Sequence, residues 1–226
     1  MIVILSKQSE LYKHLYFLPQ DIVEKGLTFS QTRQHSFFSG RVLLQKSLAF
    51  FYNINNLPKL VFEKNGRPSW ENKNLPFFNL SHSGKMVALA LGDNKLGLDI
   101  EESKKRPETL WRRVLSEKEL SFVKKSNNPH ETFTFLWTLR EALLKSSGRG
   151  LGGLSDLSFD LAKNKAFYEK LDKGNIFSWR FNLDSSLIFI SLCICAENQD
   201  IKIYSYDNQK FKLISLDLLH KFSLNK

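Results

Sequence analysis

Two acidic residues, Asp99 and Glu101, are separated by a single residue in the stretch LGLDIE. On a strand, residues two apart point to the same face, so these carboxylates would lie side by side while Leu98 and Ile100 face the core. Neighbouring carboxylates repel each other unless a cation lies between them. The pair is therefore either an ordinary solvent-facing edge or part of a site for Mg²⁺, which prefers oxygen ligands.

A third carboxylate, Glu141, lies in the stretch LWTLREALLKSSGRGL, which is typical of an apolar helix that ends at a glycine. Trp137, Glu141 and Lys145 are spaced at i, i+4 and i+8, so they would form one stripe along that helix. The stripe is either a surface Glu–Lys pair or, with Trp137 on the same side, a partly buried face. In the second case Glu141 is a candidate third metal ligand.

Ser81 and His82 belong to the stretch SHSG, which we predict to be a turn after the strand FFNL. Hydroxyl, imidazole and backbone N–H groups in a turn can bind phosphate oxygens, although the same residues also suit a plain hairpin turn. Glu119 follows Ser116 by three residues, which is the spacing of a helix capping box. It is either that capping acid or a catalytic base.

The stretch GRGLGG at 148–153 formally contains the pattern GxGxxG. A dinucleotide fingerprint follows a strand and opens a helix, whereas these glycines follow a predicted helix. We therefore expect Gly148 to be a helix C-cap and the rest to be a mobile loop.

The chain is basic: 33 Lys and Arg against 23 Asp and Glu give a formal net charge of +10. Such a charge favours an anionic partner, whether nucleic acid, an acidic protein, an anionic membrane or a polyphosphate ligand. Candidates for a basic anion site are Arg33, Arg41, Lys46, Lys64 and Arg67.

The elements needed to position these residues alternate between strands and helices, which predicts an α+β fold. Single strands are expected at 2–5, 175–183, 186–197 and 201–206. Residues 60–70 are expected to form a strand, a turn at Asn65-Gly66 and a short extended piece, and residues 77–101 three strands joined by the turns SHSGK and GDNK. Helices are expected at 29–52, after Ser116, at 131–147 and, as a short basic helix, in the tail at 216–226. A polar connector predicts two halves, 1–101 and 102–226.

The compartment is predicted from three features. No apolar run approaches the roughly 18 residues needed to cross a bilayer, and the start MIVILSK is interpreted as a strand and not as a signal peptide. Cys193 and Cys195 would share one strand face in poor geometry for a disulfide, as buried residues of a reduced protein. We therefore expect a cytoplasmic protein with no membrane partner.

Taken in order, the stretches FNLSHSG, LGLDIE and WTLREALLKSSGRGL are similar to the signatures of a known family. The set resembles the 4′-phosphopantetheinyl transferase superfamily, in its surfactin-type monomeric class, whose signatures look like GxDIE followed by WxxKEAxxK. GRVLLQKSL and NGRP extend the resemblance over residues 33 to 153. One departure is Arg140, where the family usually has Lys.

The resemblance implies a fold and an activity. The fold would consist of two similar α/β halves related by pseudo-twofold symmetry, with the active site at their junction. The enzyme would transfer the phosphopantetheine arm of coenzyme A, its co-substrate, to a serine of an apo acyl or peptidyl carrier protein. The other product would be adenosine 3′,5′-bisphosphate. The carrier is acidic, which suits the charge of +10, and no nucleic acid is expected.

The resemblance also implies roles for particular residues. Asp99, Glu101 and Glu141 would hold Mg²⁺ or Mn²⁺ against the diphosphate of coenzyme A. Lys145, His82 and Ser81 would contact that diphosphate, and Arg41 and Arg67 the phosphate or sugar of the nucleotide. The proton of the carrier serine would pass to Glu141 or Glu119, and both alternatives stay open. Two other functions remain alternatives: a metal-dependent phosphohydrolase and a basic nucleic-acid-binding module.

Overall fold

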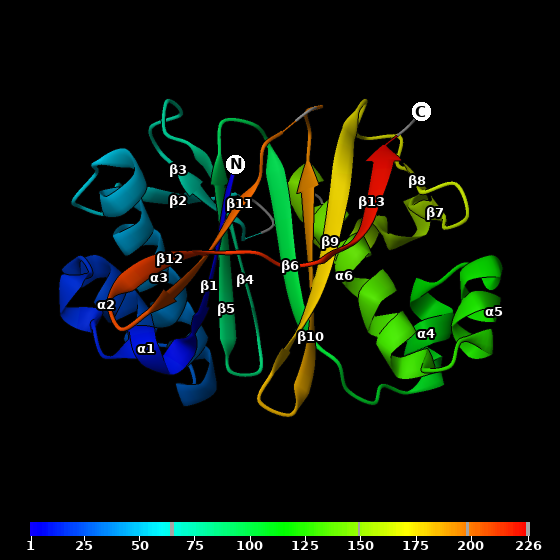
Figure 1. The fold of residues 1–226 in the computed structure, drawn as a ribbon. Coiled ribbons are helices and arrows are strands. Elements are labelled where there is room, and N and C mark those ends of the chain that lie inside the picture. The colour runs from blue at the N-terminus through cyan, green and yellow to red at the C-terminus, as the bar shows by residue number, and fades with distance from the viewer. Residues whose placement is uncertain (64–65, 149, 198, 225–226) are drawn as a thin grey trace.

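The structure, a computed structural model, describes residues 1–63, 66–148, 150–197 and 199–224. Two large sheets lie next to each other, and each carries its helices on the outer side of the molecule (Figure 1). This arrangement confirms the predicted α+β fold. Within the described residues, no helix is both long enough and apolar enough to cross a membrane.

The first sheet has the strand order β12-β11-β1-β5-β4. Its strands are β1 (Ile2–Lys7), β4 (Phe77–Ser83), β5 (Met86–Gly92), β11 (Lys202–Asp207) and β12 (Lys210–Ile214). The pairing is antiparallel except between β1 and β11. The helical elements of this half are α1 (Gln8–Tyr12), η1 (Leu15–Phe17), α2 (Gln20–Leu27) and α3 (Gln31–Tyr52). A separate hairpin pairs β2 (Leu60–Phe62) with β3 (Pro68–Trp70).

The second sheet has the strand order β6-β10-β9-β13-β8-β7. Its strands are β6 (Leu96–Glu102), β7 (Ser158–Asp160), β8 (Lys165–Phe167), β9 (Gly174–Leu183), β10 (Ser186–Ile194) and β13 (Leu218–Leu224). Its helical elements are α4 (Glu108–Val114), α5 (Glu117–Lys125), α6 (Pro129–Ser147) and η2 (Gly150–Asp156).

Both sheets repeat one connectivity. In the first, β1 is followed by helices and then by the β4–β5 hairpin, whose second strand pairs with β1. In the second, β6 is followed by helices and then by the β9–β10 hairpin, whose second strand pairs with β6. The two halves are therefore similar units, as the resemblance implied.

The pairing of strands crosses the predicted division between residues 101 and 102 in two places. Strand β6 lies before the division except for its last residue, Glu102, but belongs to the second sheet. Strands β11 and β12 follow the division but complete the first sheet. The division into 1–101 and 102–226 stays a prediction about folding units. In the sheets, each half of the sequence contributes strands to the other: β6 to the second sheet, and β11 and β12 to the first.

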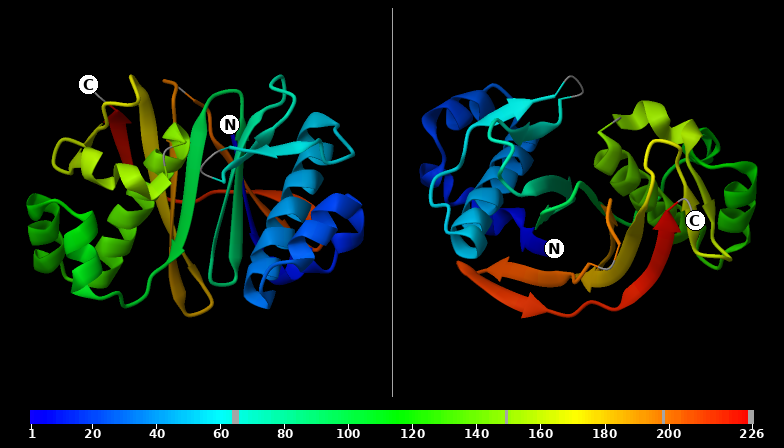
Figure 2. Two further views of the ribbon diagram at one scale, coloured as in Figure 1. Left: turned by 180° about the vertical axis from the view of Figure 1, so that it is seen from behind. Right: turned by 90° about the horizontal axis from the view of Figure 1, so that it is seen from above.

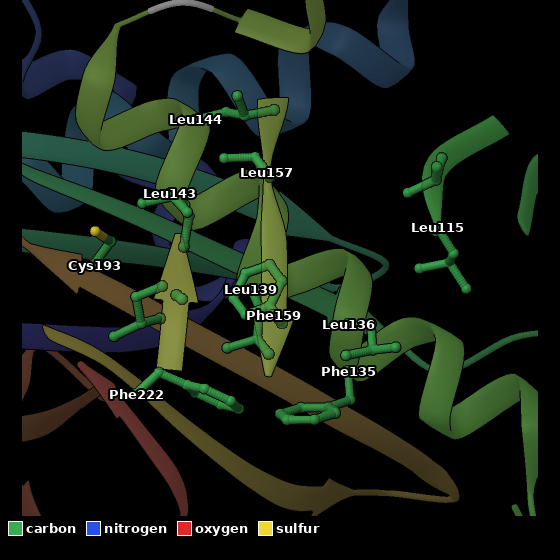
Figure 3. Packing of buried hydrophobic residues seen from close by; sticks show 14 of the residues in the cluster. Leu115, Phe135, Leu136, Leu139, Leu143, Leu144, Leu157, Phe159, Cys193 and Phe222 are labelled. Atoms are coloured by element: carbon green, nitrogen blue, oxygen red, sulfur yellow. The ribbon is translucent and has the colours of Figure 1, made fainter. Parts of the chain in front are cut away.

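Three apolar cores hold these layers together. One lies between the first sheet and its helices, around Phe38 and Leu89. A second lies between α6 and the second sheet, where Leu139, Leu143 and Phe222 pack together (Figure 3). The third lies between the two sheets and joins residues of β1 and β5 to residues of β6, β9 and β10. Viewed from above, the helices lie on the two outer sides and the strands between them (Figure 2).

Several local signals fold as predicted. Residues 31–52 form α3, and α6 begins with Pro129 in its first turn and ends at Gly148. Gly148 adopts the left-handed conformation, with φ of 76°, and is the predicted C-cap. Ser116 and Glu119 form both hydrogen bonds of a capping box at the start of α5.

Three local predictions were wrong. Ser81 and His82 lie within β4, and the turn falls at Gly84 and Lys85. The loop after α6 contains the 3₁₀ helix η2. The tail, which was predicted to be a short helix, forms the strand β13, and this strand pairs with β9 and β8. The predicted turn residue Asn65 lies outside the described residues, although β2 and β3 do form a hairpin.

Candidate active site at the junction of the two sheets

The two sheets meet where β4 lies next to β6, and polar side chains make this junction. At alternating positions of β4, three side chains accept hydrogen bonds from backbone N–H groups along the free edge of β6. The pairs are Asn79 with Leu98 at 2.8 Å, Ser81 with Ile100 at 3.3 Å and Ser83 with Glu102 at 3.0 Å. This edge would otherwise leave buried donors unpaired, which is costly. The junction therefore fixes β4 and β6 in register.

Asp99 lies at the centre of the junction and is only 4% exposed. Its Oδ1 accepts hydrogen bonds from Ser81 Oγ and from Lys145 Nζ, both at 2.8 Å. Its other oxygen, Oδ2, is buried and has no hydrogen-bond partner among the described residues. A buried carboxylate oxygen without a partner is destabilising, unless a ligand or cation completes its contacts.

Glu101 lies two residues further along β6, on the side that also carries Asp99, as predicted. Its Oε2 accepts hydrogen bonds from Ser83 Oγ at 2.9 Å and from Arg106 Nη2 at 3.0 Å. Burial and then the charge of Asp99 raise the pKa of Glu101, while Ser83 and Arg106 oppose the rise.

Glu141 belongs to α6, the helix that packs against β6. Burial, followed by the negative charge of Asp99, raises the pKa of Glu141 to about 7. Lys145 opposes this rise and Glu101 adds to it. The carboxylates of Asp99, Glu101 and Glu141 therefore act on one another across the junction, although they come from a strand and a distant helix.

No three His, Cys, Asp or Glu side chains in the described part of the chain stand in the arrangement of a formed metal centre. The chemistry of the junction nevertheless fits a hard divalent cation. The charge of Asp99 raises the pKa of Glu101, the charges of Asp99 and Glu101 raise the pKa of Glu141, and Asp99 Oδ2 has no partner among the described residues. Oxygen-only ligands of this kind suit Mg²⁺. The metal set of Asp99, Glu101 and Glu141 stays a prediction that these observations support.

Lys145 and His82 stand beside Asp99, from opposite sides of the junction. Lys145 Nζ donates to Ser81 Oγ at 3.0 Å as well as to Asp99. The pKa of His82 is lowered by partial removal of its ring from water and by the charge of Lys145, with Asp99 acting in the opposite sense. A neutral imidazole at this position can accept or donate a hydrogen bond to a ligand.

A cavity of about 480 Å³ opens next to these residues, and Ser81 and His82 form part of its wall. The cations Lys25, Arg33 and Arg41 line the same cavity. An anionic ligand in this cavity would therefore reach the polar residues of β4 and, through Ser81, the Asp99 carboxylate.

Each of these cations lies over an aromatic ring that also lines the cavity. The pairs are Lys25 over Phe62 at 3.3 Å, Arg33 over Phe29 at 4.0 Å and Arg41 over Phe37 at 4.1 Å from the ring centre. Burial, then the charge of Arg33, lower the pKa of Arg41 to about 10. Arg41 Nε is buried and has no hydrogen-bond partner in the described structure. The cavity is thus suited to a ligand with both an anionic and a flat aromatic part.

The other predicted residues lie elsewhere. Arg67 donates from Nη1 to Lys145 O and from Nη2 to Leu96 O at 3.2 Å, and it lines a different cavity from Arg41. Lys46 lies over the ring of Phe17, 3.3 Å from its centre. Lys64 is outside the described residues.

Glu119 is buried between α5 and α6. Its Oε2 accepts hydrogen bonds from the backbone N–H of Ser116 at 2.7 Å and from Arg140 Nη2. Glu119 is 2% exposed and Arg140 is 1% exposed, so they form a buried ion pair. Of the two roles that the sequence left open for Glu119, capping acid or catalytic base, the structure contains the first.

Sequence reasoning missed three contributors to the site: Lys25, Ser83 and Arg106. Ser83 could have been found, because Asn79, Ser81 and Ser83 repeat with the period of two that one face of a strand requires. Lys25 and Arg106 carry no such signal. They reach the site only because α2 and the connector after β6 fold back towards β4 and Glu101.

The fold and the junction define an α+β protein of two similar halves with an acidic centre between them. Residues 95–200 match the sequence model of the 4′-phosphopantetheinyl transferase superfamily. Over these residues the chain is similar to this superfamily, in agreement with the resemblance of its motifs.

Curated relatives agree with this assignment. The chain is 33% identical over 123 residues to 4′-phosphopantetheinyl transferase AcpT of Salmonella typhi, covering 51% of this chain and 60% of that protein. It is 26% identical over 148 residues to 4′-phosphopantetheinyl transferase Sfp of Bacillus subtilis, covering 64% and 66%. It is also 32% identical over 137 residues to the uncharacterized protein YieE of Escherichia coli K12, covering 58% and 55%.

The matched region spans 60% of AcpT and 55% of YieE, so the chain matches little more than half the length of these relatives. Among solved structures, it is similar to the holo-[acyl-carrier-protein] synthase of Thermotoga maritima, with 17% identity and a TM-score of 0.36. That match covers 55% of this chain and 84% of the other.

Proposed function

We propose that this protein transfers the 4′-phosphopantetheine group of coenzyme A to a serine hydroxyl of an apo carrier protein, in the cytoplasm. The second product is adenosine 3′,5′-bisphosphate, and a divalent cation, Mg²⁺ or Mn²⁺, is required. One observation carries the proposal. The carboxylates of Asp99, Glu101 and Glu141 act on one another at a junction that opens, through Ser81 and His82, into a basic aromatic cavity.

The cavity supports binding of the nucleotide end of coenzyme A. Arg33 and Arg41 supply positive charge, and Arg41 Nε offers a buried donor to a phosphate oxygen. The rings of Phe29 and Phe37 offer flat apolar surface for an adenine. Ser81 and His82 then face the diphosphate that follows the nucleotide. Arg67, which lines a different cavity, is proposed to support Lys145 through the Lys145 backbone carbonyl and not to contact the nucleotide directly.

Asp99, Glu101 and Glu141 would hold the cation. When bound, the ion would neutralise charge that develops on the phosphoryl oxygens of the diphosphate. Lys145 contacts Asp99 in this structure, and its flexible side chain can turn its ammonium group towards the diphosphate. His82 donates or accepts a hydrogen bond at the same group.

The carrier serine must lose a proton, and we assign this role to Glu141. Glu141 acts electrostatically with Asp99 and Lys145, so it lies near the reacting phosphorus that these residues would surround. Glu119 is held by Ser116 and Arg140, and it is buried away from the cavity that would hold coenzyme A. Glu119 is therefore proposed to be structural.

The test is the mass of the carrier. Purified protein is incubated with coenzyme A, Mg²⁺ and an apo acyl or peptidyl carrier protein, and the carrier is weighed. A gain of one phosphopantetheine group, lost on chelation of the metal, is the expected result. Release of nucleotide without a change in the carrier would instead indicate a phosphohydrolase that uses the same carboxylates with water. Salt-sensitive binding of oligonucleotides without either reaction would indicate a nucleic-acid-binding module.

Matched variants make this test specific. Asp99→Asn and Glu141→Gln should each reduce transfer by at least about a hundredfold, in the range that loss of one charged catalytic group usually produces. Asp207→Asn alters an exposed aspartate at the end of β11 and should leave transfer unchanged. Near-normal turnover of the Asp99 or Glu141 variant would contradict the assignment of the site.

A further inference from the structure

Two serines of β4, Ser81 and Ser83, donate hydrogen bonds to the two neighbouring acids of β6. At the first of these acids, Asp99 Oδ1 accepts from Ser81 Oγ and from Lys145 Nζ, both at 2.8 Å. Asp99 Oδ2 is buried and has no hydrogen-bond partner in the described chain. One serine and one cation thus hold one oxygen of Asp99 and leave the other oxygen for a ligand.

Glu101 repeats this arrangement with different partners. Its Oε2 accepts from Ser83 Oγ at 2.9 Å and from Arg106 Nη2 at 3.0 Å. Within the described parts of the chain, no hydrogen bond reaches Glu101 Oε1. The same pattern on two acids of one strand face leaves one oxygen of each open to a shared cation.

Ser83 is held in place by the backbone of β6 as well as by Glu101. Its Oγ accepts the backbone N–H of Glu102 at 3.0 Å while it donates its proton to Glu101. Ser83 is only 8% exposed, so water competes little for either contact. Because the hydroxyl is committed both as donor and as acceptor, it fixes the direction of the Glu101 carboxylate.

Arg106 acts on the same oxygen of Glu101 but adds a charge. It belongs to the connector between β6 and α4, and its side chain is 20% exposed, against 18% for Glu101. Among the described residues, Glu101 is the only hydrogen-bond partner of the guanidinium group, whose Nε is buried without one. Arg106 therefore compensates the negative charge of Glu101, and it would repel a divalent cation bound to that carboxylate.

We propose that Ser83 and Arg106 set the cation affinity of Glu101 in opposite directions. Ser83 is a positioning residue that presents Oε1 of Glu101 to the cation. Arg106 is a counter-ion that competes with the cation for the charge of the carboxylate. This inference rests on the proposed metal role of Asp99, Glu101 and Glu141, and it adds what determines how tightly the cation is held.

The consequence is a site with a defined geometry and a limited affinity. Mg²⁺ requires oxygen ligands in nearly octahedral positions, and a carboxylate held in one direction helps to satisfy that requirement. Arg106 offsets part of the attraction between the three carboxylates and the cation. Tight binding of the cation then depends on the further negative charge that the diphosphate of coenzyme A brings.

The experiment measures cation binding directly, without coenzyme A and without transfer. Full-length protein treated with a chelator is titrated with MgCl₂ in a calorimeter, at pH 8 and at constant ionic strength. Ser83→Ala should raise the Kd for Mg²⁺ by about tenfold or more, the usual loss when the partner of a metal ligand is removed. Arg106→Met should lower that Kd by about threefold to tenfold, because the repulsion between the guanidinium group and the cation is removed.

Conservative variants and matched controls separate these roles from effects on folding. Ser83→Thr keeps the hydroxyl and Arg106→Lys keeps the charge, so both should bind Mg²⁺ like the wild type. Ser205→Ala changes a serine on β11 of the first sheet, and Arg113→Met removes an exposed cation of α4. Neither control should alter the Kd. Urea unfolding checks that each variant is folded under the conditions of the titration.

The signs of the two changes decide the outcome. A Kd that stays the same in Ser83→Ala and Arg106→Met, or that moves in one direction in both, would overturn this inference and leave the cation site in place. An equal fall of the Kd in Arg106→Met and Arg113→Met would overturn the role of Arg106, because total charge alone would then set the affinity. A wild type that binds no Mg²⁺ would instead contradict the cation site of the proposed function, and this inference with it.

Discussion

Glu141 shows how a single carboxylate can report on the site without any substrate. Its burial and the nearby charges of Asp99 and Glu101 disfavour ionisation in the metal-free protein. The folded state then holds the Glu141 proton more tightly than the unfolded state does. Stability consequently falls as pH rises from the ordinary value of 4.5 through the folded pKa of about 7.

Replacing Glu141 with Gln removes this ionisation. In buffers with a chelator, we expect the wild type to lose on the order of 1–3 kcal/mol of unfolding free energy through this group between about pH 5 and pH 8. The Gln variant should lack that loss and should be the more stable protein at pH 8. Urea denaturation at a series of pH values measures both profiles.

A second measurement connects the same residue to metal binding. At pH 8, Mg²⁺ should raise the melting temperature of the wild type, because a cation relieves the repulsion among the three carboxylates. The rise should be lost in Glu141→Gln and in Asp99→Asn. Profiles with the same pH dependence in wild type and variant, or a Mg²⁺ effect that persists in both variants, would contradict this account of the site.

For single residues, the sequence predicted which side chains lie together wherever the regular spacing of one strand or one helix determines it. Asp99 and Glu101 share a side because they are two apart on β6, and Lys145 approaches them because it follows Glu141 by one helical turn. The neighbours of these residues were less predictable. Arg106 contacts Glu101, and Lys25 enters the basic cavity, through folding that no local spacing encodes.

The helices α5 and α6 are joined by the buried pair of Glu119 and Arg140. Arg140 also donates from Nη1 to the backbone carbonyls of Leu154 and Leu157 at 3.4 Å. The guanidinium group thus links α5 and α6 to η2 and to the residue that follows η2. The family's usual Lys has one nitrogen and could not make this set of contacts.

Removal of one partner should therefore destabilise the fold. We expect Glu119→Ala to lower the free energy of unfolding by about 3–5 kcal/mol, because it leaves Arg140 charged, buried and unpaired. Urea denaturation measures the change. A variant with unchanged stability but no transferase activity would show that Glu119 is a catalytic base, in place of the structural role proposed above.

Close contact between α6 and β6 is possible because residue 97 is glycine. A Cβ atom at this position would lie 2.0 Å from Ala142 O and 2.3 Å from Ser146 N. Both are backbone atoms of the helix that carries Glu141 and Lys145, so they cannot turn away as a flexible side chain would. The absence of a side chain at Gly97 therefore sets the distance between the helix and the acidic pair.

Gly97→Ala should separate α6 from β6. We expect a loss of about 1–3 kcal/mol in unfolding free energy, which is typical of overpacking, and a fall in transfer larger than the remaining folded fraction explains. Gly152→Ala is the matched control, because a Cβ atom there would meet nothing within 4 Å. Equal behaviour of the two variants would show that the approach at Gly97 is not needed.

At the scale of elements, the long helices were predictable and the last strand was not. The helices α3 and α6 have many apolar residues and clear ends, including Pro129 and Gly148. The tail at 218–224 is short, and its few alternating apolar and polar residues do not distinguish a helix from a strand. It becomes β13 because β9 and β8 supply strand partners on both of its sides.

For the whole molecule, the pairing of strands depends on residues far apart in the sequence. Strand β1 pairs in parallel with β11, two hundred residues later, and β6 pairs with β10 across most of the second half. Nothing local in these strands marks their partners. The predicted pair of similar halves was correct because the resemblance carried it, while the exchange of β11 and β12 into the first sheet had no sequence signal.

The charge of the molecule is also unevenly distributed. Residues 104–125, which form the connector after β6 together with α4 and α5, contain eight Lys and Arg residues and three Glu residues. Their net charge of +5 is half of the total of +10. This basic segment begins three residues after Glu101, and its helices lie at the outer end of the second half (Figure 1). An acidic carrier protein would be attracted to this end of the molecule.

Reversing two of these charges tests the attraction. Arg112 and Arg113 are exposed on α4, and we expect the double change to Glu to lower kcat/KM for the carrier by about tenfold at low salt, a size within the range of electrostatic steering. The KM for coenzyme A should stay the same, because the nucleotide cavity is lined by other cations. Raising the ionic strength should reduce the difference from the wild type, since exposed charges are screened.

The control keeps the change in net charge and moves its position. Lys210 and Lys212 are exposed on β12, in the first sheet, so the same double change to Glu alters the total charge equally at a distant place. If steering depends on the basic segment at 104–125, only the α4 variant shows a lower kcat/KM for the carrier at low salt. Equal losses in both variants would mean that total charge alone attracts the carrier, and unchanged kcat/KM in both would mean that the carrier docks without help from this charge.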